Sequence, residues 1–257
     1  MNIVRCRTHI VLFALLALVP ATRGRAQTPA PEPPPVWDTQ FGLAFVGTSG
    51  NTDTTTFGAD FAAHRRWPLW KIDAMATGVQ TETGDVKTAE RYIASLRGQR
   101  KLSSLLGLST GERVEHDPFA GVDFRSIADV GLTWNLANQA HWIFEATTAL
   151  AWSHEKPTIG DSTNHPTGVL EALSTIPFGA TGGKSTQRFT FYPDFEDASA
   201  YRSEAEVTAQ ATMNSHLALK FGYLFRFSNQ PLAGFKKADN TTTASVVLTL
   251  RSADTIH

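Results

Sequence analysis

Residues Thr241 to Leu250 read TTTASVVLTL, and their side chains fall into two classes when every second residue is taken. This repeat of two predicts a β-strand with one face in apolar surroundings and the other in polar surroundings. Such strands occur in soluble sandwiches, in ligand-binding barrels and in membrane barrels, so this strand alone does not decide the class. The apolar class is Thr242, Ala244, Val246, Leu248 and Leu250, and the polar class is Thr241, Thr243, Ser245, Val247 and Thr249.

The same repeat of two recurs along the chain after residue 36, where no segment shows a sustained helical repeat. We predict twelve strands from it. An even number places both ends of the sheet on one side, so the last strand can pair with the first and leave no free edge. The predicted strands are Asp38–Gly47, Thr54–Arg65, Leu69–Gln80, Arg91–Gln99, Leu105–Val114, Phe124–Asn135, His141–Ser153, Gly168–Ile176, Ser185–Tyr192, Ala200–Met213, His216–Ser228 and Asn240–Leu250.

The predicted connections differ between the two ends of the sheet. Those at residues 65–69, 101–105, 135–140, 178–184 and 213–215 are short, whereas those at 81–90, 115–123, 154–167, 193–198 and 229–239 are mostly longer and polar. Short turns at one end and longer loops at the other are typical of an up-and-down transmembrane β-barrel. The expected strand length of ten to twelve residues also suits a bilayer better than a globular core, where strands average about five to six.

Tryptophan positions support the membrane barrel. Trp142 and Trp152 are ten residues apart on one face of a strand, which is about 33 Å along the strand and about 25 Å along a tilted barrel axis. That distance matches an apolar band bounded by aromatic girdles, and it favours an apolar face that points outward to lipid. The predicted girdle is Trp37, Trp67, Trp70, Trp134 and Trp142 on the short-turn side and Trp152 on the other side.

The opposite, polar face would line the interior. Its charges are of both signs, so we expect ion pairs across a narrow lumen and no selectivity ring of one sign. The predicted lumen residues are Asp60, Asp73, Arg97, Arg113, Glu145, Glu204, Glu206, Lys220 and Arg226.

The chain begins with a segment typical of a secretory signal peptide. Basic residues precede an apolar run from Ile10 to Val19, and small residues at Gly24 and Ala26 fit a cleavage site. Cleavage would remove the lone cysteine, Cys6, and four of the 23 basic residues, leaving a net charge of −5 against 24 acidic residues. A chain so acidic and free of thiols argues against nucleic-acid binding and thiol chemistry. We therefore expect a signal peptide over 1–26, a proline-rich tether over 27–36, a barrel over 37–250 and a C-terminal extension over 251–257.

Two strings imitate catalytic motifs without their structural context. Gly107 to Gly111 matches G-x-S-x-G around Ser109, but it lies inside an alternating strand and no helix follows. The string from Gly179 to Thr186 lacks the first glycine of a phosphate-binding loop and reads as a hairpin turn. Ser153 and His154 are neighbours in a strand and would point to opposite faces. The histidines show no metal-binding spacing, so we expect no catalytic, cofactor or metal site.

Four stretches resemble the bacterial family of putative salt-induced outer-membrane proteins, a domain of unknown function. They are GTSGNTDTTTF at 47–57, KTAER at 87–91, FAGVDFR at 119–125 and, most specifically, GFKKADNTTTASVVLTL at 234–250. The resemblance implies a Gram-negative outer-membrane barrel and no reaction. The chain departs from common outer-membrane practice at its end, because the last predicted strand closes near Leu250 without a terminal aromatic residue.

We therefore expect a monomeric, porin-like outer-membrane barrel without enzymatic activity, either structural or a narrow pore, with a link to salt or acid stress. Its expected partners are outer-membrane lipid, lipopolysaccharide, which Lys236 and Lys237 could contact, and the barrel assembly machinery. Two alternatives stay open on the sequence alone: an outer-membrane lipid hydrolase and a soluble periplasmic barrel that binds an apolar ligand.

Overall fold

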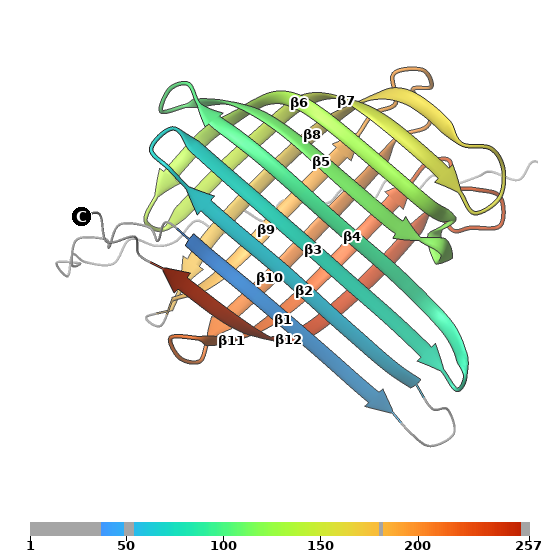
Figure 1. Ribbon diagram of the computed structural model, residues 1–257, viewed down its shortest axis with the longest axis horizontal. Coiled ribbons are helices and arrows are strands. Elements are labelled where there is room, and N and C mark those ends of the chain that lie inside the picture. The colour runs from blue at the N-terminus through green and yellow to red at the C-terminus, as the bar shows by residue number, and fades with distance from the viewer. Residues whose placement is uncertain (1–36, 49–53, 180–181, 253–257) are drawn as a thin grey trace, which may run out of the picture. The chain divides into compact units, whose positions relative to one another are not determined.

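The computed structural model describes residues 37–48, 54–179 and 182–252, and these residues form a closed antiparallel barrel of twelve strands (Figure 1). Each strand pairs with its neighbours in the chain, and β12 pairs with β1 to complete the ring. The predicted fold class and strand number are confirmed. The strands are β1 (Trp37–Thr48), β2 (Thr54–Arg66), β3 (Trp70–Thr83), β4 (Val86–Lys101), β5 (Leu106–Asp117), β6 (Val122–Gln139), β7 (Trp142–Pro157), β8 (Thr163–Phe178), β9 (Gly183–Tyr192), β10 (Arg202–Thr212), β11 (Leu217–Ser228) and β12 (Ala238–Ser252).

The closing strand has the two faces that its sequence predicts. Ser245, Val247 and Thr249 are buried, whereas Val246 and Leu248 on the alternate face are exposed. The apolar side chains of this strand therefore point away from the interior. This is the arrangement of a transmembrane barrel, in which apolar residues face outward and polar residues face the lumen.

The seam that closes the ring is shorter than the neighbouring contacts. The pairing of β1 with β12 runs from Trp37 opposite Ser252 to Leu43 opposite Val246, whereas β1 pairs with β2 along its whole described length. β12 runs two residues past the predicted end at Leu250 and ends at Ser252. The barrel thus closes on a strand without a terminal aromatic residue.

The strands also extend further than predicted on the side of the longer connections. The predicted polar loop over 81–90 is wrong: the ladder between β3 and β4 continues to Thr83 and Val86, and only Gly84 and Asp85 connect the strands. Gly84 has a φ of 59°, a left-handed conformation that glycine adopts without a steric penalty. Two described connections on this side, 193–201 and 229–237, have nine residues each. These two account for the difference in connection length between the two ends of the barrel.

We call the end that carries these connections the loop side and the opposite end the turn side. A 3-10 helix over Pro118–Ala120 (η1) joins β5 to β6 on the loop side, and Gly121 follows it with a φ of 83°. A Cβ on Gly121 would lie 3.2 Å from the ring of Phe235 and 3.3 Å from Leu232. The connection between β11 and β12 therefore packs on the turn between β5 and β6, which belongs to another part of the ring.

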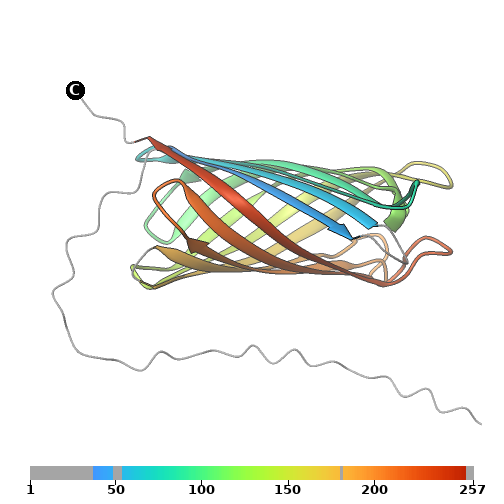
Figure 2. The ribbon, with the colours of Figure 1, turned by 90° about the horizontal axis from the view of Figure 1, so that it is seen from below.

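Few apolar side chains lie inside the barrel. Ile127, Ala149, Val169 and Tyr192 form a small buried cluster on β6 to β9. Large apolar side chains on the outer face are exposed, among them Phe45 at 72%, Leu150 at 68% and Phe221 at 59%. Among the described residues no helix is long and apolar enough to cross a membrane. Figure 2 shows the strands inclined to the long direction of the barrel, as closure of a sheet requires.

Candidate functional site: a charge-paired lumen

The nine predicted lumen residues all lie on the face of their strands that turns away from the exposed apolar residues. None of them is exposed, and each has intermediate burial. The structure brings eight of them into ion pairs, and Glu206 lies two residues from Glu204 on the same face of β10. Most partners in these pairs were not among the predicted residues.

One ion pair crosses the lumen directly. Nη2 of Arg113 on β5 donates to both Oε1 and Oε2 of Glu204 on β10 at 3.0 Å. Four strands lie between β5 and β10 on the shorter way round the ring, so these two side chains can meet only through the interior. Their side chains are 22% and 16% exposed, so the pair is partly shielded from water and still partly open to screening by salt.

A second set of charges, the loop-side network, gathers around Glu115 on β5. The Glu115 carboxylate is 4% exposed and lies 3.2 Å from Nη1 of Arg125, 3.2 Å from Nη1 of Arg226 and 3.6 Å from Nε of Arg91. Arg226 comes from β11, on the far side of the ring from β5. A carboxylate buried this deeply is stable only with such partners, because burying an unpaired charge is costly. The other acidic members are Asp117 and Asp239, which contact Arg226, and Glu155, whose Oε2 lies 2.7 Å from Nε of Arg125.

Further ion pairs lie nearer the turn side. Lys71 on β3 contacts Asp73 at 3.2 Å and Glu145 on β7 at 3.4 Å, and Nδ1 of His64 lies 2.7 Å from Asp73. Two more pairs join strands that are not adjacent: Arg97 with Asp129 at 2.8 and 3.0 Å, and Lys220 with Asp60 at 3.3 Å. Among the described residues, pairing of opposite charges therefore continues along the interior from the loop side to the turn side.

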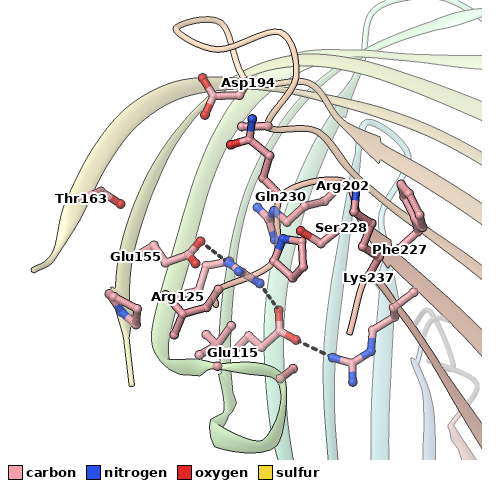
Figure 3. A pocket seen from close by; sticks show the side chains of 18 of the residues that line it. Glu115, Arg125, Glu155, Thr163, Asp194, Arg202, Phe227, Ser228, Gln230 and Lys237 are labelled. Atoms are coloured by element: carbon pink, nitrogen blue, oxygen red, sulfur yellow. Dashed lines mark hydrogen bonds and ion pairs between the residues drawn. The ribbon is translucent and has the colours of Figure 1, made fainter. Parts of the chain in front are cut away.

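A cavity of about 810 Å³ lies on the loop side of these cross-lumen pairs (Figure 3). On β5 and β10, the lining residues farthest from the loop side are Glu115 and Glu204. Their ion pairs with Arg226 and Arg113 therefore form the bottom of the cavity. Figure 3 shows the ion pairs of Glu155, Arg125 and Glu115 along one side of the cavity. A smaller recess of about 170 Å³ lies on the turn side, lined by Trp67, Trp70, Lys71, Glu145 and neighbouring residues.

The rim of the loop-side cavity is held by contacts between the two long connections. Nε2 of Gln230 donates to Oδ2 of Asp197 at 3.2 Å and to Oγ of Ser199 at 2.5 Å. Asp197 also accepts hydrogen bonds from the backbone and hydroxyl of Ser199, which hold the pKa of this exposed carboxyl below its usual range. The connection over 193–201 is therefore tied to the connection over 229–237.

The predicted girdle tryptophans are mostly on the outer surface. Trp37, Trp67, Trp70, Trp142 and Trp152 are 38% to 54% exposed, whereas Trp134 has intermediate burial. On the turn side, the guanidinium of Arg65 lies 4.6 Å from the rings of both Trp37 and Trp67. A cation at the level of exposed tryptophans is the arrangement found at membrane–water interfaces.

The candidate nucleophiles are not assembled for catalysis. Ser109 is 1% exposed, Ser153 is completely buried, and neither hydroxyl has a hydrogen-bond partner. Ser153 is the register partner of His165, whose Nε2 lies 3.4 Å from Asp194, a juxtaposition that the sequence reasoning missed. A nucleophile needs a hydrogen bond to its base and access to substrate, and Ser153 has neither. Among the described residues no three His, Cys, Asp or Glu side chains gather in a way that could hold a metal ion.

Some lumen-lining charged residues that the sequence analysis did not predict follow the alternation of their strands. Glu115 and Asp117 continue the alternation of Arg113 on β5, but the predicted strand ended at Val114 and left them in a loop. Arg125 and Asp129 alternate in the same way on β6. Extending the parity of β5 beyond Val114 would have found Glu115 and Asp117, whereas Arg125 and Asp129 lay inside the predicted strand Phe124–Asn135 and were overlooked there. The other missed residues with interior ion pairs include Lys71, Arg91, Glu155, Glu171 and Arg188.

Comparison with solved structures returns bacterial barrels of low similarity. The NanC porin is 14% identical, with 84% of this chain and 98% of that chain covered and a TM-score of 0.47. The translocator domain of the autotransporter NalP from Neisseria meningitidis is 11% identical, covering 84% and 87%, with a TM-score of 0.40. The anion-selective porin from Comamonas acidovorans is 11% identical, covering 83% and 98%, with a TM-score of 0.36.

These scores are too low to add to the argument from geometry. No curated protein matches the chain significantly. The model of one protein family does match, over residues 41–250, which spans nearly the whole barrel from β1 to β12. The chain belongs to the DUF481 family, proteins of unknown function.

Proposed function

We propose that this protein is an outer-membrane barrel that forms a narrow pore for small hydrated solutes. The observation that carries the proposal is the pair of Arg113 and Glu204, which meets across the lumen at 3.0 Å beneath a cavity open to the loop side. A polar interior crossed by paired charges gives water and ions a path while excluding larger solutes. The exposed apolar side chains outside the barrel support its placement in lipid.

The proposed setting follows from the two ends of the barrel. A signal peptide over 1–26 would deliver the chain to the periplasm, and the barrel assembly machinery would insert it as a monomer. The turn side, with four of the exposed tryptophans, would face the periplasm, and the loop side would face outward. Lys236 and Lys237 on the loop side would then lie where they can contact lipopolysaccharide.

A link to salt follows from the same charges. Screening by salt weakens ion pairs that water can reach, and the lumen pairs retain partial exposure. We propose that the constriction loosens as ionic strength rises, so that conductance increases more steeply than the conductivity of the bathing solution. This behaviour would support the stress role that the family resemblance suggested.

The test is single-channel conductance of the purified protein in planar bilayers across a series of KCl concentrations. Removing the cross-lumen pair with Arg113→Ala and Glu204→Ala together should raise conductance above that of the natural protein. The matched control is Lys87→Ala with Glu90→Ala, which removes an ion pair of 3.0 Å between residues three apart on β4. Equal conductance in the two double variants would refute a constriction at Arg113, and absence of conductance in every form would refute the pore.

We also propose that the protein has no catalytic activity. Ser153 and His165 are the strongest enzymatic candidates because they face each other in register, yet the serine hydroxyl is buried and makes no hydrogen bond. A lipid hydrolase would need the serine to reach an ester in the surrounding bilayer, and Ser153 lies on the inward face. The geometry therefore favours a passive barrel over an enzyme.

A further inference from the structure

We propose that the loop-side cavity is a binding site for a small hydroxylated carboxylate of the size of a sugar acid, with Arg202 as the anion-binding residue. This inference rests on the proposed pore only for its biological setting, since the site is a property of the cavity itself. A volume of about 810 Å³ lies in the range of small-molecule pockets. The evidence is the difference between Arg202 and the other charges of this cavity.

Arg202 has no carboxylate within ion-pair distance among the described residues, whereas Arg125 and Arg226, which line the same cavity, each contact two or more. Its recorded contact is with an aromatic ring, as its guanidinium lies 5.1 Å from the ring centre of Tyr192. Figure 3 agrees, because the dashed lines connect other charged residues and none reaches Arg202. The five N–H donors of this side chain are therefore available to a ligand.

The acids around the cavity are already satisfied. Glu155 and Glu115 hold Arg125, Glu204 holds Arg113, and Asp239 holds Arg226. Asp194 contacts His165, and Asp197 accepts from Ser199 and Gln230. Glu196, which is exposed, is the remaining acid of the lining. An incoming anion would thus meet one guanidinium without a carboxylate partner, while the carboxylates of Glu196 and Asp197, which have no Lys or Arg partner among the described residues, lie at the rim.

The surroundings of Arg202 suit a carboxylate that carries hydroxyl groups. Contact with the buried ring of Tyr192 limits the orientations of the guanidinium, and a planar guanidinium binds a carboxylate through two parallel hydrogen bonds. Ser228 is the register partner of Arg202, and its hydroxyl makes no hydrogen bond among the described residues. Thr163 on β8 is also in the lining, and its hydroxyl makes no hydrogen bond within the part of the chain that the structure describes. These groups could bind the hydroxyls of a sugar acid but would give a simple hydrocarbon anion nothing.

The rim favours arrival of an anion. Lys236 and Lys237 are exposed on the connection between β11 and β12, and both line the cavity. Lys237 donates to Oδ1 of Asn229 at 3.2 Å, and no carboxylate lies within ion-pair distance of either lysine among the described residues. Positive charges at the mouth of a cleft raise the local concentration of anions. Removing them should slow association and leave the bound contacts unchanged.

The experiment is isothermal titration calorimetry of the detergent-solubilised barrel at constant ionic strength. The titrants are sodium glucuronate, glucose, sodium acetate and glucose 6-phosphate. The variants are Arg202→Gln, Arg202→Lys and, as the matched control, Lys87→Gln, which removes one positive charge from the loop-side end of β4 at a residue that does not line the cavity. Near-ultraviolet circular dichroism and heat-dependent gel mobility report that each variant retains its folded barrel.

We expect saturable binding of glucuronate that is stronger than that of acetate, and no binding of glucose. A bidentate contact of this kind is worth about 2 kcal/mol, so Arg202→Gln should weaken glucuronate binding about thirtyfold or more. Arg202→Lys should retain part of the affinity, and Lys87→Gln should retain all of it. Equal affinity in Arg202→Gln and the natural protein, binding of glucose, or no binding of glucuronate would each overturn the proposal.

Binding of glucose 6-phosphate without glucuronate would overturn the assignment of a carboxylate in favour of a phosphate ester. Because the titration needs no membrane, its result is independent of conductance. A barrel that binds glucuronate and carries no current would refute the pore and leave the site standing. A conducting barrel without binding would do the reverse.

Discussion

The ion pair of Arg113 and Glu204 should couple the two sides of the barrel energetically. Two unit charges about 4 Å apart attract each other by about 4 kcal/mol at an effective dielectric constant of about 20. Removing one partner also leaves the other charge largely buried, which in known proteins costs about 3 to 5 kcal/mol. The two side chains retain some exposure, 22% and 16%, so we expect the lower end of that range. Arg113→Met and Glu204→Leu should each lower the free energy of unfolding by about 3 kcal/mol.

The double variant should be far less damaged than the sum of the single ones. Replacing both charges by apolar side chains of similar size removes the unpaired charge together with the pair, and such replacements are often close to neutral. With each single variant destabilised by about 3 kcal/mol and the double variant close to the natural protein, we expect a coupling energy that approaches about 6 kcal/mol. The measurement is reversible urea unfolding in lipid vesicles, followed by tryptophan fluorescence, for the natural protein and the three variants.

A matched cycle calibrates the result. Lys87 and Glu90 are also 3.0 Å apart, but they are neighbours on β4 and Lys87 is 39% exposed. Exposed pairs of this kind contribute little to stability, so the coupling energy of this pair should be much smaller than that of Arg113 with Glu204. If the coupling of Arg113 with Glu204 were no larger than that of Lys87 with Glu90, the lumen pair would be solvated like a surface pair, and the reasoning about a partly buried constriction would fail.

Three further predictions test the outward face, the packing between strands and the absence of catalysis. Phe221→Arg places a charge on the outward face of β11 and should lower the free energy of unfolding in vesicles by about 2 to 4 kcal/mol, whereas Ile159→Arg in the connection after β7 should change it by less than about 0.5 kcal/mol. Equal tolerance of the two would show that Phe221 does not face lipid. Gly131→Ala should destabilise the barrel by about 1 to 3 kcal/mol or more in the same assay, because its Cβ would clash with the carbonyl oxygen of Thr148 and with the backbone of Ala149. Gly98→Ala, where a Cβ meets nothing within 4 Å, serves as the control, and a neutral Gly131→Ala would contradict the close approach of β6 and β7. Vesicles of radiolabelled phospholipid should release no fatty acid with either the natural protein or Ser153→Ala, and release that depends on Ser153 would restore the hydrolase.

The central part of each strand was predictable from the sequence because one of its faces meets the lumen and the other is the apolar outer face. In β12 the alternation of Thr243, Ala244, Ser245 and Val246 reflects lumen and lipid directly, and the structure places these residues accordingly. The pairing of β12 with β1 was predictable for two reasons. The even strand number places both ends of the sheet on one side, and pairing of the first and last strands leaves no free edge. The repeat of two therefore carried enough information for strand number, order and facing.

The polar ends of the strands were not predictable from the same signal. Beyond the apolar band both faces of a strand meet polar surroundings, so the apolar–polar alternation disappears although the backbone ladder and the alternation of the inward charges continue. Thr83 and Val86 were assigned to a loop for this reason, and so were Glu115 and Asp117. One of the three arginines that pair with Glu115 is Arg226, which lies 111 residues away in the chain, and no local pattern reports such a partner. A sequence gives the parity of a lumen charge but not its partner across the ring.

The cross-lumen ion pairs both stabilise the barrel and narrow the path that a solute would take. Arg113 with Glu204 and Arg226 with Glu115 tie strands on opposite sides of the ring, and the same atoms occupy the space through which a solute would pass. A variant that removes one charge should therefore lose stability and gain conductance together. The apolar double variant of Arg113 and Glu204 separates the two effects, because it restores stability while leaving uncharged side chains in the path. If conductance then stays low, the constriction is steric; if it rises, the paired charges themselves hold the path closed, and only the second outcome is compatible with control by salt.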